Sequence, residues 1–252
     1  MKKFIYLMVL IALLAGIIAW WMLGSKDNSR LTTYTLGDKL VIESFDPQTK
    51  EGVRIEIPGN FEIDSVAGRG KWWLSKIRKA GDKRWLTESI AWHFGLGQIY
   101  PREDIGFWRF NKKIIWKDID ITKTGLADKT QTVDGEDVWV LNSRWFKNEF
   151  FVDSRIANEK LSVAVVNTTS TNGLGAKVAE IIEMVGMRTT MLETTNSDLS
   201  ESCVLTTSSS NHKKFGVLYL IKVFECSQKT DESLKDDIRL ELGKKLVLRL
   251  FG

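Results

Sequence analysis

The chain has 252 residues, of which 43% are hydrophobic and 27% are charged, and its formal net charge at pH 7 is +4. This length is enough for one large or two small domains. The net charge is too small, and too mixed in sign, to indicate a nucleic-acid-binding protein, and no such motif is visible.

The chain begins with an apolar segment. Two lysines precede twenty uncharged residues, 4–23. As a helix that rises about 1.5 Å per residue, this run would span a hydrocarbon core of roughly 30 Å. Trp20 and Trp21 suit a membrane–water interface. We therefore expect residues 1–25 to form a transmembrane anchor.

A cleaved secretory signal is the alternative reading of this segment. Such signals have an apolar core of about 7–15 residues and a small-residue cleavage site, and neither feature is present. The lysines before the span favour a cytoplasmic N-terminus, because positive charge is retained inside. We therefore expect a single-pass protein of the cell membrane with an extracytoplasmic body.

The rest of the chain divides by composition into two halves. All ten tryptophans lie at or before Trp145, all three prolines lie in the first half, and small, aliphatic and Ser/Thr-rich sequence begins at Leu161. We place the boundary in the charged stretch 153–160. This predicts a mixed α/β domain over 26–158 and a small domain over 159–252.

The first half shows both strand and helix patterns. Alternating apolar residues and a central turn predict a hairpin over 38–57. A helix is expected over 86–94, with Thr87 as a possible N-cap and Gly95 as its stop. Residues 138–144 fit either a strand or a short helix.

The second half gives a complete order of elements. Strands are expected over 161–166, 187–192, 203–207 and 238–242, and helices over 176–185 and 215–224. The order β-α-β-β-α-β indicates a split-βαβ sheet with two helices on one face. The overall fold class is thus α/β (α+β). In the first turn, Asn167 is a capping residue, and Gly173 and Gly175 supply backbone freedom.

The two cysteines, Cys203 and Cys226, leave two readings open. Outside the cytoplasm they would form a disulfide. Otherwise they are two small buried hydrophobes. The sequence contains two cysteines and two histidines, His93 and His212, and this set does not indicate a zinc site. We assign no metal, cofactor or catalytic residue.

A family resemblance covers residues 160–247. It is carried by the strand residues Val163, Val165, Val166 and Asn167, by Gly173-Leu174-Gly175-Ala176, by Gly186, and by Leu242-Gly243. The segment resembles the LytR C-terminal domain of LytR-CpsA-Psr cell-envelope proteins. Thr168 stands where that family usually has glycine.

Residues 38–97 resemble a shortened catalytic domain of the same family. Ile57-Pro58-Gly59-Asn60 stands where members read Ile-Pro-Arg-Asp, and Gly68-Arg69-Gly70-Lys71 resembles the Gly-x-Gly-Lys that follows. The resemblance implies transfer of glycopolymers from a polyprenyl-pyrophosphate carrier to the wall, with cations and a divalent metal at the pyrophosphate. Gly59 and Asn60 lack the guanidinium and the carboxylate, and an amide is a poor Mg²⁺ ligand.

The resemblance and its departures together predict a non-catalytic envelope protein. Candidate ligand-binding residues are the cations Arg69, Lys71 and Arg144, which suit a phosphate, and the pair Trp72 and Trp73, which suits a sugar or lipid. Expected partners are the membrane, a cell-wall polymer or polyprenyl-phosphate lipid, and envelope proteins, but not nucleic acid.

Two alternatives remain. The first is an active glycopolymer phosphotransferase with a displaced site, for which Asp64, Glu88 and Asp104 are the candidate acids. The second is an assembly module that binds only other proteins. His93 is read as a core or surface histidine rather than a catalytic base, because its helix is rich in apolar residues.

Overall fold

A computed structural model describes residues 29–80, 82–105, 114–195, 197 and 199–251. The predicted transmembrane anchor therefore lies outside the described residues. Within the described ranges, no helix combines the length and hydrophobicity needed to cross a membrane.

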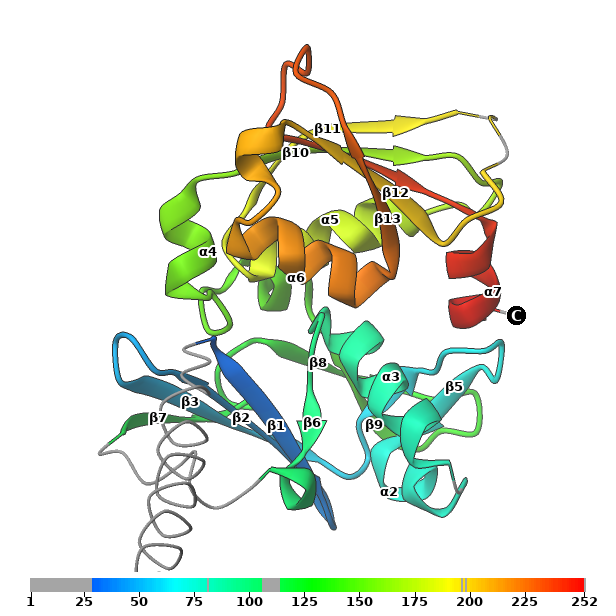
Figure 1. Cartoon of the computed structure of the whole chain (residues 1–252). Coiled ribbons are helices and arrows are strands. Elements are labelled where there is room, and N and C mark those ends of the chain that lie inside the picture. The colour runs from blue at the N-terminus through cyan, green and yellow to red at the C-terminus, as the bar shows by residue number, and fades with distance from the viewer. Residues whose placement is uncertain (1–28, 81, 106–113, 196, 198, 252) are drawn as a thin grey trace, which may run out of the picture.

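Two five-stranded sheets lie one above the other, with helices between them (Figure 1). The lower sheet belongs to the first half and has the order β6-β1-β2-β3-β7. Its strands are β1 (Leu31–Leu36), β2 (Lys39–Asp46), β3 (Glu51–Pro58), β6 (Tyr100–Pro101) and β7 (Ile115–Asp120). Two small hairpins flank it: β4 (Glu62–Asp64) with β5 (Lys71–Trp73), and β8 (Ala127–Gln131) with β9 (Asp137–Leu141). Its helices are α2 (Leu74–Ile77), α3 (Lys83–Phe94) and α4 (Ser154–Glu159), with 3-10 turns over Arg78–Ala80, Arg102–Asp104 and Ser143–Lys147.

The hairpin predicted over 38–57 is confirmed. β2 and β3 pair antiparallel, and Leu40 stands opposite Ile57. Strand alternation points one face inward, so Leu40, Ile42, Ile55 and Ile57 are fully buried. Residues 138–144 contain both alternatives in succession, because β9 ends at Leu141 and a 3-10 turn follows.

The predicted helix over 86–94 is α3, but it begins three residues earlier. Asp82, not Thr87, is the N-cap, and its carboxylate accepts the Arg84 N–H at 2.9 Å. The Thr87 hydroxyl instead bonds the carbonyl of Lys83. Gly95 ends the helix as expected, with φ at 69°.

The upper sheet contains every strand predicted for the second half, and one more. Its order is β11-β10-β14-β12-β13, from β10 (Ser162–Asn167), β11 (Arg188–Thr194), β12 (Cys203–Thr207), β13 (Cys226–Thr230) and β14 (Ile238–Leu242). The helices α5 (Leu174–Met184) and α6 (Phe215–Phe224) lie on its lower face, toward the first half (Figure 1), and α7 (Lys244–Phe251) follows β14.

The predicted split-βαβ topology is wrong in detail. β10 bonds directly to β11, and β12 directly to β13, so neither parallel pair is split by another strand. β13 was missed because its sequence, Cys-Ser-Gln-Lys-Thr, is polar and exposed after the cysteine. α7 was missed although Leu246 and Leu250 are buried at helical spacing.

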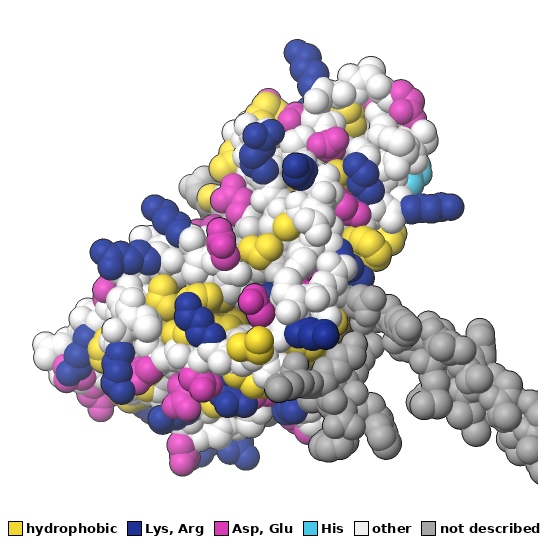
Figure 2. Space-filling view, turned by 90° about the vertical axis from the view of Figure 1, so that its left-hand side faces the viewer, with side chains coloured by type: hydrophobic (Ala, Val, Ile, Leu, Met, Phe, Trp, Pro, Cys, Tyr) yellow, Lys and Arg dark blue, Asp and Glu magenta, His cyan; other side chains and the backbone are white. Residues whose placement is uncertain are grey.

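The buried side chains of both halves form one continuous hydrophobic cluster. Trp145, a member of this cluster, is fully buried, meets Phe94 edge to face with ring centroids 5.3 Å apart, and donates its indole N–H to the Phe94 carbonyl at 2.8 Å. On the surface, Figure 2 shows Lys and Arg side chains interspersed with Asp and Glu over both halves, so neither sign dominates that face.

Cys203 and Cys226 form a disulfide in the structure. They occupy directly paired positions on β12 and β13, with Cα atoms 4.5 Å apart. α6 lies between the two cysteines in the chain, so the bond closes a loop that contains this helix. The cysteines are 23 positions apart in sequence.

Replacement of both cysteines by alanine should lower the free energy of unfolding by about 3 kcal/mol, the loop-closure entropy expected for a loop of this length. Urea titrations of the oxidised wild type, the reduced wild type and the C203A/C226A variant measure it. Equal midpoints for oxidised and reduced wild type would contradict the prediction.

Candidate functional site

Two cavities open where the two halves meet, one of about 230 Å³ and the other of about 260 Å³. Both are lined by the same central residues, which are Leu96, Gly97, Gln98, Tyr100 and Lys222. The cavities are therefore two ends of one depression along α6, which we call the junction groove.

One wall of the junction groove is the segment that follows α3. Gly95 adopts the left-handed conformation, which turns the chain out of the helix. The segment then runs to Tyr100 and Pro101, which pair parallel with β1 as β6. Helix termination and sheet pairing thus hold Gln98 and Tyr100 at the groove.

The opposite wall is α6. Phe215, Leu218 and Lys222 recur at helical spacing and all line the groove. Phe215 is 47% exposed and Leu218 is 49% exposed, so the helix presents an unusually apolar surface there. Tyr219 lies between them, and Trp92 contributes a further aromatic ring at the other end.

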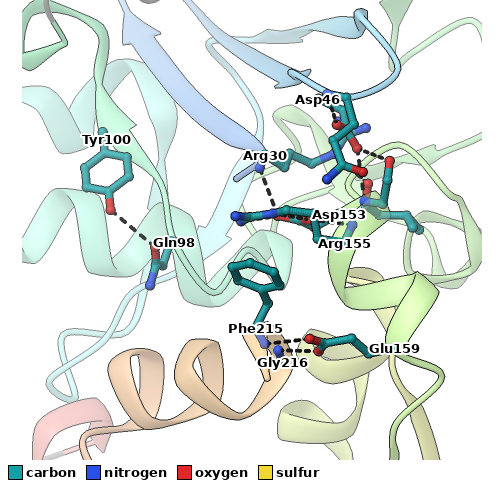
Figure 3. A network of polar contacts seen from close by, with 12 residues as sticks. Arg30, Asp46, Gln98, Tyr100, Asp153, Arg155, Glu159, Phe215 and Gly216 are labelled. Carbon is teal, nitrogen blue, oxygen red and sulfur yellow. Dashed lines mark hydrogen bonds and ion pairs between the residues drawn. The ribbon is translucent and has the colours of Figure 1, made fainter. Parts of the chain in front are cut away.

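Lys222 lies where the two cavities join. Its ammonium donates to the Tyr100 hydroxyl at 3.3 Å, and that hydroxyl donates to Gln98 Oε1 at 3.3 Å; Figure 3 shows the second bond. Among the described residues, no carboxylate pairs with Lys222. The groove therefore has one cation at its centre whose charge is not neutralised.

The other charges around the groove are paired. Arg155 pairs with Asp153 at 3.3 Å and lies over the Phe215 ring at 4.2 Å. Arg249 pairs with Glu225 at 2.8 Å. The net electrostatic preference of the groove is therefore set by Lys222 and favours an anion.

Arg30 forms part of the groove wall but has a structural role. Its guanidinium donates to the carbonyls of Val152 at 2.7 Å and Phe150 at 2.8 Å. Burial lowers the pKa of Arg30, and the charges of Asp46 and Asp153 oppose that shift. The start of β1 is thereby tied to the segment that joins the halves.

The predicted boundary stretch is folded as α4 and contacts both halves (Figure 3). At one end, Asp46 accepts both the Ser154 backbone N–H at 3.0 Å and the Ser154 hydroxyl. At the other, Glu159 accepts the N–H groups of Phe215 at 2.7 Å and Gly216 at 2.9 Å. Glu159 thus caps α6, which has no side-chain cap of its own.

The residues predicted to bind a ligand lie elsewhere. Arg69 stacks over Trp85, and Trp72 meets the same ring edge to face. Lys71 pairs with Glu62 at 2.7 Å. The two tryptophans have different neighbours: Trp72 contacts Trp85, and Trp73 lies under Lys76 at 4.1 Å. Both are half-buried, and neither lines the junction groove.

Arg144 is not brought to the other predicted ligand residues by any contact in the described structure. It lies in the 3-10 turn after β9, where its guanidinium faces Gly125. In the turn after β10, Asn167 donates to the Thr171 carbonyl at 2.9 Å and Gly173 has φ of 78°.

The positions that match the family's Arg-Asp pair have structural roles here. A Cβ at Gly59 would lie 2.5 Å from the Asp38 carbonyl oxygen, so no side chain fits without a backbone shift. Asn60 donates to the Asp137 carbonyl at 3.1 Å. Within the described ranges, no three His, Cys, Asp or Glu residues are arranged to hold a metal ion.

The acids named for a displaced site are dispersed into separate pairs. Asp64 contacts His93, Glu88 pairs with Arg84 at 2.9 Å, and Asp104 pairs with Lys83 at 2.7 Å. Only Glu88 lies at the junction groove.

The junction groove itself was not predicted. Many of its residues come from the continuous stretch of α3 and the segment up to Tyr100, and others come from α6, which is far from that stretch in sequence. The one available signal was the apolar surface of α6 in the sequence Phe-Gly-Val-Leu-Tyr-Leu-Ile-Lys-Val-Phe, which has only a single charge in ten residues.

No protein-family model matches the chain, and no curated protein matches it. Two solved structures from B. subtilis, TagU and TagV, are similar at 11% identity and a TM-score of 0.23. The aligned regions cover 86% of this chain and 92% of TagU, and 88% and 94% for TagV. At this TM-score the likeness carries no argument about fold or function.

Gly97→Ala should destabilise the protein by about 1–3 kcal/mol, because the added methyl group would overlap the buried Tyr219 hydroxyl. In a Tyr219→Phe background the cost should fall, since the hydroxyl is gone. Gly37→Ala, which meets nothing within 4 Å, is the control. Chemical denaturation measures the wild type, the three variants of the cycle and the control, and an equal cost of Gly97→Ala in both backgrounds would contradict the contact.

His93 should make stability depend on pH. Its Nδ1 accepts the Asp64 N–H at 3.0 Å, and its Nε2 is buried with no partner in the described residues. Burial lowers the pKa of His93, against the raising effect of Asp64. As the pH falls below about 6.5, this histidine becomes protonated in the unfolded chain while it stays neutral in the folded chain. The free energy of unfolding therefore decreases by up to about 1.4 kcal/mol for each pH unit.

The measurement is the free energy of unfolding at several pH values between neutrality and pH of about 5 for wild type and His93→Gln. The variant should show a shallower slope, and His212→Gln serves as the matched control. An unchanged slope in His93→Gln would show that other groups cause the dependence.

Proposed function

We propose that the chain is a membrane-anchored, extracytoplasmic, non-catalytic protein of the bacterial cell envelope. Its ligand is an anionic wall glycopolymer, bound in the junction groove. The uncompensated charge of Lys222 between aromatic side chains is the observation that carries the binding proposal.

The proposed location has two supports beyond the family resemblance. Residues 4–23 have the length and composition of a membrane span. The Cys203–Cys226 disulfide agrees with a compartment outside the cytoplasm, because such bonds persist in oxidising environments.

The chemistry of the groove suits a charged glycan. Rings such as Tyr100, Tyr219 and Trp92 offer apolar faces and edges against which sugar rings pack. Gln98 can exchange hydrogen bonds with hydroxyl groups, and Lys222 attracts a phosphate or carboxylate. Few polar groups among apolar ones are typical of a specific ligand site.

The non-catalytic part of the proposal rests on Gly59 and Asn60. The first position has no room for an arginine side chain, and the second holds an amide in place of a carboxylate. A pyrophosphate bound at these two positions would lack the guanidinium and the metal-binding carboxylate that stabilise the leaving group.

Lys222→Met should weaken binding of a poly(glycerol phosphate) wall polymer by about tenfold or more, through loss of a charged contact worth about 1.5–3 kcal/mol. Lys222→Arg should retain most of the affinity. Lys213→Met, which removes an exposed charge from the loop before α6, is the control. Titration calorimetry of the full chain in nanodiscs gives the dissociation constants.

The same titration separates the alternatives. Equal affinity in wild type and Lys222→Met would reject the junction groove as the site. Transfer from a polyprenyl-pyrophosphate-linked glycan to peptidoglycan with Mg²⁺, above a control without protein, would overturn the non-catalytic assignment. No glycan binding, with a protein partner lost on Phe215→Ser, would favour an assembly module.

A further inference from the structure

The positive charge of the chain is concentrated in one short segment. Residues 69–84 contain seven Lys and Arg and a single Asp, a net charge of +6, whereas the whole chain has +4. The remaining residues therefore carry a net −2. The segment also holds two adjacent tryptophans, Trp72 and Trp73.

Most of these cations have local partners that fix or neutralise them. Lys71 pairs with Glu62, Arg84 with Glu88, and Lys83 with Glu103 and Asp104; Arg69 lies over the Trp85 ring. The exposed cations Lys76, Arg78 and Lys79 differ. Within the described ranges no carboxylate pairs with any of them. We call these three, together with Trp73, the basic surface.

The backbone that carries the basic surface is held in place by packing and by a hydrogen bond. α2 and the 3-10 turn after it bury Leu74 and Ile77, which leaves the cations outside. The Ser75 N–H donates to the Gly59 carbonyl at 2.8 Å, which fastens α2 to the end of β3. The Lys76 ammonium lies over the Trp73 ring, 4.1 Å from its centroid. The half-buried indole and the three exposed cations therefore form one surface.

We propose that the basic surface docks on the anionic headgroups of a phospholipid bilayer. α2 lies at the lower edge of the molecule (Figure 1), and the basic surface contributes no residue to either cavity of the junction groove. A polymer chain or small ligand is usually held in a concave site, whereas clustered cations outside any such cavity suit an extended charged plane. Tryptophan beside lysine and arginine is typical of such an interface.

This docking goes beyond the proposed function and does not depend on it. Figure 1 places α2 at the end of the molecule opposite the upper sheet. Contact through α2 would therefore hold the first half against the headgroups and direct the second half away from the membrane.

The test is hydrogen exchange of the full chain reconstituted in nanodiscs of phosphatidylcholine, with and without phosphatidylglycerol. The amides of residues 71–80 should exchange about tenfold more slowly on the anionic discs, and the effect should disappear in high salt. Equal exchange on both kinds of disc would overturn the proposal.

Charge-reversal variants assign the effect. K76E/R78E/K79E should lose the protection, whereas K213E/K229E/K235E, with the same change of charge on exposed positions of the second half, should keep it. Equal protection in both variants would overturn the assignment to the basic surface. Protection that appears only when soluble poly(glycerol phosphate) is added would show a polymer site instead. Polymer affinity of K76E/R78E/K79E on neutral discs tests the junction groove separately.

Discussion

Charge that is buried where the two halves meet has to be paired, and this requirement fixes how they meet. Arg30 is held by two backbone carbonyls, and Asp46 by the first residue of α4. Glu159, one turn further on, caps α6. An unpaired charge in such a place costs several kcal/mol. The short helix α4 therefore sets the distance between the lower sheet and α6, and with it the width of the junction groove.

Local sequence patterns predicted most elements, because burial follows a simple period where one face is apolar. The β2–β3 hairpin, β14 and α6 are of this kind. β13 failed because only its cysteine is buried, so no alternation marks it. The prediction of Thr87 as the N-cap is wrong because the carboxylate of Asp82 accepts the backbone N–H of Arg84, in the first turn of the helix. Asp and Thr are both common capping residues, so the sequence alone does not decide between them.

The candidate site was beyond prediction for a different reason. Lys222 is significant only because Tyr100 lies beside it and no carboxylate of the described residues pairs with it, and both facts depend on how the halves pack. Two of the predicted cations, Arg69 and Lys71, belong to the segment that resembles the family motif. The structure pairs Lys71 with Glu62 and stacks Arg69 on Trp85, which local sequence did not reveal. In the part of the chain that the structure describes, their neighbours Lys76, Arg78 and Lys79 are cations without a carboxylate partner.

The disulfide has a mechanical consequence. β13 is an edge strand with a single neighbour, and α6 leads directly into it. Because Cys203 and Cys226 are joined, α6 belongs to a covalently closed ring. A load applied to a ligand on α6 would be transmitted to β12 in the sheet through a covalent bond. Under such a load, α6 and β13 would therefore stay attached to β12 even if the hydrogen bonds of the edge strand were broken.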